Sequence, residues 1–269
     1  MNRIDNSIFE PRTVGVFFVK IGHLSFLKNR EVNILRTATQ LSQDDPNVFN
    51  VFWMAGLERK GTVQVMTPPY LSGRYIAAEL SAIKWLLEQA NVCGHDKTGA
   101  GLHLYLSSQD TLDLVQKTSQ SSHIVPYVNF LHTRFYGCEV SLDEDRTWAT
   151  AGCEKEVSAI NATPIRTSIS VQGVGEVELT AHAVEMYVMR FGRKPTRAWR
   201  ELIKQAETAK EIYFVDRHPV FDVQHRNPGK HYATQGGQIF VITPPNADSP
   251  MPRLVTVTKP SSLPARFIS

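Results

Sequence analysis

Histidine, arginine and lysine side chains gather in the last third of the chain. RNA can be cleaved without a metal when a base takes the 2′-OH proton and an acid protonates the leaving 5′-oxygen, while cations stabilise the phosphorane. Histidine suits both proton transfers because its pKa lies near neutrality, and the arginine fork matches two phosphate oxygens. The residues concerned are His182, His218, His225 and His231 with Arg190, Arg217, Arg226 and Lys230.

We expect His182 and His231 to transfer protons. Tyr232 follows His231 directly, and neighbouring residues of a strand face opposite sides, so only one of the two can point at His182. We favour Tyr232 as a residue that packs or stacks on a base, although the reverse assignment stays open. The predicted phosphate-binding cations are Arg190, Lys230 and Arg226.

Each of these residues also has an ordinary interpretation. His182 near a helix start can simply be hydrated, and any loop histidine is more often a surface residue than a catalyst. The basic segment 193–197 is typical of a solvated turn, and only secondarily of a phosphate-binding edge. No HxH, HxxxH or CxxC spacing occurs, so we predict neither a metal site nor a cofactor.

One predicted helix carries both His182 and Arg190. Thr180 is a good N-cap, Gly192 a good stop, and Val184, Val188 and Phe191 form an apolar stripe over 181–191. A second helix should begin at Pro195. Strands are expected at 167–172, 176–179, 211–215, 230–234, 238–243 and 253–259, with a hairpin turn at 235–237. The C-terminal part is therefore predicted to be an α+β unit with two helices packed on an antiparallel sheet.

This part resembles small bacterial and phage domains of the RelE/BrnT kind, which have the barnase-like ribonuclease fold. The matching segments are His182-Ala-Val-Glu-Met-Tyr-Val-Met-Arg190, Trp199-Arg-Glu-Leu-Ile203, Gly236-Gly-Gln-Ile-Phe-Val-Ile242 and Leu254-Val-Thr-Val-Thr258. The resemblance spans about residues 176–259 and implies a toxin-type ribonuclease, with an antitoxin as protein partner. Met186 stands where the family usually has its first arginine, so one phosphate-binding guanidinium is absent.

The N-terminal part has a different pattern. Strands are predicted at 14–20, 32–39, 48–54, 62–66 and 102–106, an amphipathic helix at 75–90, and a further helix from Ser107-Ser-Gln-Asp110 to Lys117. This order resembles a ribonuclease H-like domain, locally in Tyr75-Ile-Ala-Ala-Glu79-Leu-Ser-Ala-Ile and Leu104-Tyr-Leu-Ser-Ser108-Gln. Glu79 then matches the metal-binding helix glutamate, but Ser108 stands at the aspartate position. Because Mg²⁺ needs several oxygen ligands, the resemblance implies a copy without a catalytic metal site. The alternative is an unrelated α/β domain with a solvated Glu79.

Bulk properties describe an ordinary globular protein. The 269 residues, 42% hydrophobic and 20% charged, favour two domains, and a polar stretch from Ser141 to Thr163 places the boundary near residue 160. Three scattered cysteines, no run of 18 apolar residues and no secretory core at the N-terminus favour a cytoplasmic protein without membrane contact. Residues 1–150 carry 14 Lys+Arg and 15 Asp+Glu, whereas residues 151–269 carry 15 and 11.

Two functions fit these features. In the first, a nucleic-acid-associated protein of phage or mobile-element type cleaves RNA without a metal through its C-terminal domain (161–269), while the α/β domain (1–160) is an inactive ribonuclease H-like copy. In the second, both active centres are lost and the chain is a nucleic-acid-binding or assembly subunit of a larger complex. RNA or another nucleic acid is the expected partner in both cases.

Overall fold

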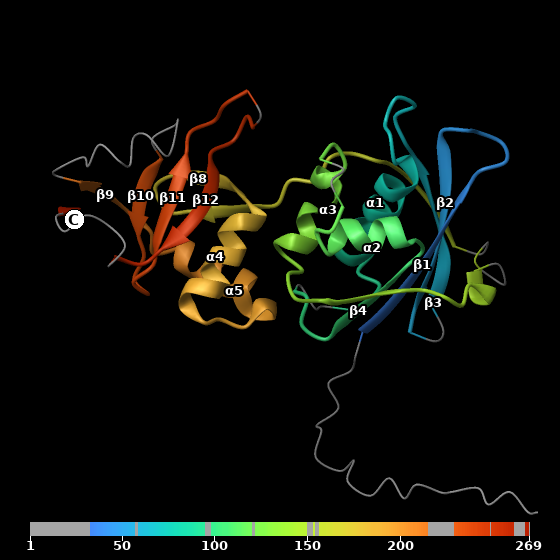
Figure 1. Cartoon of the computed structure of the whole chain (residues 1–269), viewed down its shortest axis with the longest axis horizontal. Helices are drawn as coiled ribbons and strands as arrows, with labels where there is room; N and C mark the ends of the chain where they lie inside the picture. The colour runs from blue at the N-terminus through green and yellow to red at the C-terminus, as the bar shows by residue number, and fades with distance from the viewer. Residues whose placement is uncertain are drawn as a thin grey trace, which may run out of the picture. The chain divides into compact units, whose positions relative to one another are not determined.

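The computed structural model describes residues 33–56, 59–94, 98–119, 122–149, 153, 156–214, 229–247, 249–260 and 267–268. In these residues the chain forms two mixed β-sheets and five α-helices (Figure 1). The predicted strand at 14–20 lies outside the described residues, as do Arg217, His218, His225 and Arg226.

The first sheet has the strand order β5-β4-β1-β2-β3-β6. β1, β2 and β3 are antiparallel neighbours, whereas β4 runs parallel to β1, β5 to β4 and β6 to β3. The strands predicted at 32–39, 48–54, 62–66 and 102–106 are thereby confirmed. The bounds are β1 (Asn33–Leu41), β2 (Val48–Ala55), β3 (Arg59–Met66), β4 (Leu102–Leu106), β5 (Glu139–Leu142) and β6 (Val157–Asn161).

Three helices lie on one side of this sheet (Figure 1). They are α1 (Arg74–Glu88), α2 (Gln109–Val115) and α3 (Val125–His132). Burial alternates along β2, where Phe49, Val51, Trp53 and Ala55 enter the core shared with α1. Thr37 pairs with Trp53 and so belongs to this helix-covered face, while Arg36 belongs to the opposite face.

The sequence left the structure of two N-terminal segments, 123–131 and 141–163, undecided or unpredicted. The apolar run 123–131 fits a strand or a buried helix in the sequence, and the structure makes it helix α3 because Pro126 sits in the first turn, where no N–H is needed. The polar stretch 141–163 contains the end of β5 and all of β6, which no sequence pattern predicted. Their residues are half exposed because both are edge strands.

The second sheet has the order β13-β9-β10-β11-β12-β8-β7. Its core packs against two helices, α4 (Ala181–Phe191) and α5 (Ala198–Ala206). The start and stop of α4 are confirmed, since the Thr180 hydroxyl accepts the Ala183 N–H and Gly192 adopts φ 60°. The strands are β7 (Ser168–Val171), β8 (Gly175–Leu179), β9 (Lys210–Phe214), β10 (Lys230–Ala233), β11 (Ile239–Thr243), β12 (Arg253–Thr258) and β13 (Phe267–Ile268).

The predicted antiparallel arrangement is confirmed for β9, β10, β11 and β12, but the C-terminal sheet as a whole is mixed. β8 and β12 are parallel neighbours, fixed by Glu178 N–H donating to the Pro252 carbonyl at 2.8 Å. β8 precedes both helices and β12 closes the later meander, so no tight turn links the two strands and they can run in the same direction. Each sheet has a buried cluster of its own. A domain boundary near residue 160 stays a prediction.

Candidate functional site

Glu79 is a fully buried carboxylate on α1, 0% exposed, and three donors surround it. The Thr37 hydroxyl donates to Oε1 at 2.7 Å, the Ser107 N–H to Oε1 at 2.6 Å and the Thr111 hydroxyl to Oε2 at 2.8 Å. Thr37 comes from the middle of β1, Ser107 follows β4, and Thr111 lies in the first turns of α2. We call these four residues the Glu79 cluster.

The resemblance to ribonuclease H-like domains predicts Glu79 as a metal ligand and an aspartate position at Ser108. Ser108, the residue predicted at the aspartate position, caps α2 by accepting the Thr111 N–H at 3.2 Å. The preceding residue, Ser107, offers Glu79 a backbone N–H instead. The alternative of a solvated Glu79 is wrong, because the side chain is fully buried.

In the Glu79 cluster a buried carboxyl group accepts hydrogen bonds from its neighbours. Burial raises the pKa of Glu79, and the hydrogen bonds from Thr37, Ser107 and Thr111 partly oppose that rise. All three groups direct hydrogens at the carboxylate, and none adds the negative oxygen ligands that Mg²⁺ needs. Across the described ranges, no group of three or more His, Cys, Asp or Glu residues could hold a metal ion.

The opposite face of the same sheet carries a polar and aromatic cluster around Arg36. The Arg36 Nε donates to Asp143 Oδ2 at 2.8 Å, and its Nη2 binds Oδ1. The Trp148 indole N–H also donates to Asp143 Oδ2, at 3.1 Å. The guanidinium lies 5.6 Å from the ring centres of both Tyr105 and Trp148. With Asp143 only 2% exposed, this is a closed ion pair that fixes β1 to the segment after β5.

A serine, a histidine and a glutamate lie next to one another near the Arg36 cluster. His103 Nε2 lies 3.0 Å from Ser141 Oγ, and His103 Nδ1 lies 3.4 Å from Glu139 Oε2. This is the order of nucleophile, base and orienting carboxylate. Acyl transfer also needs a hydrogen-bond donor that stabilises the oxyanion. The cation near this trio, Arg36, is already bound by Asp143 and so does not serve as that donor. Sequence reasoning missed the trio because only the parallel pairing of β4 with β5 brings its members together.

His182 and Arg190 lie at opposite ends of α4. His182 is exposed in the first turn, and eight residues at 1.5 Å rise put it about 12 Å along the axis from Arg190. The Arg190 guanidinium donates to the Val257 carbonyl at 2.7 Å and to the Thr256 hydroxyl at 3.4 Å. Arg190 therefore fastens α4 to β12.

The other predicted site residues share one strand, β10. Tyr232 is 5% exposed and belongs to the core beneath the helices, while Lys230 Nζ lies 3.1 Å from the Glu211 carboxylate. β11 separates β10 from β12, so these residues are about 10 Å across the sheet from the strand that Arg190 binds. His231 is half-buried, opposite Val241 of β11.

An exposed row of cations follows α4. Arg197 is the N-cap of α5, and Arg200 and Lys204 lie on the helix; at 100° per residue the three fall within about 60° of one another, opposite the buried face. Lys194 lies exposed just before them. The acid within this stretch, Glu201, is occupied, because Tyr187 donates to it at 2.7 Å and Arg193 lies 3.4 Å away. We call Lys194, Arg197, Arg200 and Lys204 the basic face.

Comparison with known proteins gives no relative. No protein-family model matches the chain, and neither a curated protein nor a solved structure does. None of the helices in the described ranges is long and apolar enough to cross a membrane.

Proposed function

We propose that this chain binds nucleic acid through the basic face, and that its N-terminal part is a ribonuclease H-like scaffold without metal-dependent activity. The observation that carries the proposal is the row of exposed cations Lys194, Arg197, Arg200 and Lys204, which runs along the turn before α5 and along α5 itself. Exposed cations at such spacing are what phosphate backbones recognise.

The scaffold part of the proposal rests on element order and on the Glu79 cluster. Three antiparallel strands are followed by helix α1, a strand parallel to β1 and then α2, an order that resembles that of ribonuclease H-like domains. Glu79 keeps the position of the helix glutamate, while hydroxyl and N–H donors take the place of further carboxylates. This supports a binding rather than a hydrolytic role for the sheet.

Metal-independent RNA cleavage is the second candidate, and the exposure of His182 is the observation in its favour. Against it, Arg190 is bound to a sheet carbonyl, Lys230 is paired with Glu211 and Tyr232 is a core residue. Arg190, Lys230 and Tyr232 thus have structural tasks that compete with a catalytic one.

A gel-shift series tests the proposal. A variant with Arg197→Gln, Arg200→Gln and Lys204→Gln should lose at least tenfold in affinity for labelled RNA or DNA, whereas Arg59→Gln with Lys60→Gln on β3 should keep it. Equal affinities for the wild type and the triple variant would sink the proposal. Binding to anionic lipid vesicles without binding to nucleic acid would also contradict it, since a basic helix face suits both surfaces.

Incubation with RNA in EDTA separates the two candidates. The binding proposal expects intact RNA with the wild type and with His182→Ala alike. Cleavage by the wild type that is lost in His182→Ala would instead establish the ribonuclease.

A further inference from the structure

The β6 edge of the first sheet presents backbone groups to an incoming strand. Among the residues that the structure describes, β6 pairs only with β3, and it is last in the sheet order. The Thr62 N–H donates to the Glu156 carbonyl at 2.7 Å and the Ala162 N–H to the Met66 carbonyl at 2.8 Å. These bonds show that even-numbered residues of this strand face β3. Odd-numbered residues therefore direct their N–H and C=O groups to the open edge.

The same odd-numbered residues are the exposed ones. Burial along β6 alternates, with Val157, Ala159 and Asn161 exposed, and Val157 is 54% exposed. Natural edge strands are usually blunted by lysine, proline or a bulge. Val157-Ser-Ala-Ile-Asn161 contains no charged residue and no proline, and its pairing with β3 is continuous. Nothing in this strand opposes a further strand.

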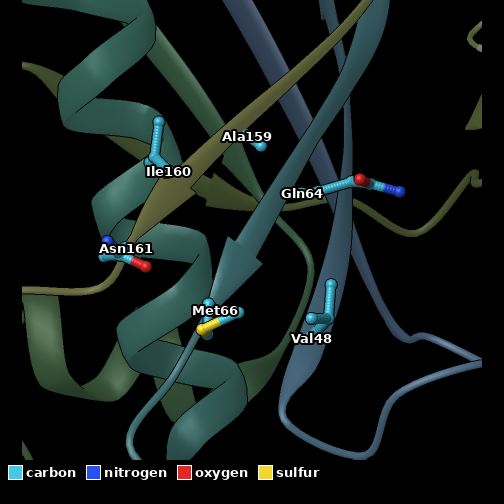
Figure 2. A pocket seen from close by; sticks show the side chains of 6 residues that line it. All are labelled: Val48, Gln64, Met66, Ala159, Ile160 and Asn161. Carbon is cyan, nitrogen blue, oxygen red and sulfur yellow. The ribbon is translucent and has the colours of Figure 1, made fainter.

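A shallow groove of about 290 Å³ adjoins the edge and shows what kind of partner fits (Figure 2). All of its lining side chains are uncharged, and Met66 is 51% exposed. An uncharged, extended polypeptide suits such a surface, whereas phosphate or a charged peptide would find no counter-charge. The groove is lined by Val48, Gln64, Met66, Ala159, Ile160 and Asn161.

We propose that β6 pairs antiparallel with β6 of a second copy of this chain, about a two-fold axis at Ala159. In this register Ala159 faces Ala159, and Val157 faces Asn161. Every paired residue belongs to the odd-numbered set, so each outward N–H and C=O finds a partner. No charges meet across the axis. The side chain of Val157 from one copy then lies in the row of Asn161 and Met66 of the other.

Cysteine cross-linking tests the register directly. Residues that exchange both hydrogen bonds in an antiparallel pair have Cα atoms about 5.5 Å apart, within the range of a disulfide. Ala159→Cys should therefore form a covalent dimer on mild oxidation. Asn161→Cys alone should stay at the level of the unaltered chain, which has three cysteines of its own. A mixture of Val157→Cys and Asn161→Cys should cross-link.

Sedimentation at increasing protein concentration tests the association itself. Ala159→Pro removes the central outward N–H but no bond to β3, so the fold should persist while self-association weakens at least tenfold. Val157→Lys should act likewise, and Val125→Lys on the exposed surface of α3 is the matched control. A wild type that stays monomeric at every concentration, or cross-linking of Asn161→Cys equal to that of Ala159→Cys, would overturn the proposal.

Discussion

At the scale of single residues, Glu79 shows how partners decide what a carboxylate can do. Its helix position alone fits a metal ligand. The side chains and the N–H that surround it are donors, so the carboxylate is satisfied by the protein itself. Sequence could identify Glu79 and the missing aspartates. Thr37 and Thr111 could not be found as its partners, because only the pairing of β1 with β4 and the start of α2 bring them to it.

Replacing Glu79 by glutamine should alter how stability depends on pH. Burial raises the folded-state pKa of Glu79 above its ordinary value of 4.5, so the folded state holds its proton more tightly than the unfolded state. The contribution of Glu79 to stability is therefore full below pH about 4.5 and is lost as pH rises through the folded pKa. Glu79→Gln cannot titrate, so its stability relative to the wild type should increase from pH 4 to pH 8. Urea unfolding measures this, with exposed Glu207→Gln as control. Parallel stability curves would contradict the burial argument.

Two threonines of β1 should respond oppositely to the same change. Thr37→Val removes a donor from a buried carboxylate and should cost about 1–3 kcal/mol of unfolding free energy. Thr39→Val should be neutral or stabilising, because the buried Thr39 hydroxyl has no hydrogen-bond partner among the described residues. Thermal or urea unfolding of both variants checks the contrast. A similar loss of unfolding free energy in both variants would mean that the change to valine itself, and not the lost hydrogen bond, is responsible.

At the scale of elements, hydrophobic periodicity and capping residues predicted the helices well. The edge strands were not predicted. α1 and α4 carry clear apolar stripes, and the Thr180 and Gly192 signals marked the ends of α4. β5 and β6 are short edge strands without a fully buried residue, so they lack the repeated buried apolar positions that mark β2. The parallel pairing of β8 with β12 joins segments far apart in the chain, and no local signal encodes it.

The N-cap of α4 gives an element-scale prediction. The Thr180 hydroxyl accepts the Ala183 N–H at 3.2 Å and donates to the Leu254 carbonyl at 2.9 Å, so it both starts the helix and ties it to β12. Thr180→Ala should lower the unfolding free energy by about 1–2 kcal/mol. Thr196→Ala, in the half-buried turn before α5, should change it by less than about 0.5 kcal/mol. Equal unfolding midpoints for the two variants would show that the cap contributes nothing.

At the scale of the whole molecule, the chain offers two surfaces with different chemistry. The basic face on α5 suits phosphate, whereas the β6 edge is uncharged and suits an extended strand. Part of the basic face is predictable from the basic segment 193–197, and helical spacing from Arg197 would add Arg200 and Lys204. The β6 edge could not be predicted, since the strand itself was not. Together, the two proposals describe a subunit that binds nucleic acid and associates with a second copy of itself.

The salt dependence of nucleic-acid binding tests the central proposal most directly. Each cation that contacts a phosphate adds about 0.7–0.9 to the slope of log K against log salt concentration. The triple variant Arg197→Gln, Arg200→Gln and Lys204→Gln should therefore show a slope shallower than that of the wild type by about 2–3. Identical slopes for the two proteins, or affinity that does not change with salt, would contradict binding through the basic face.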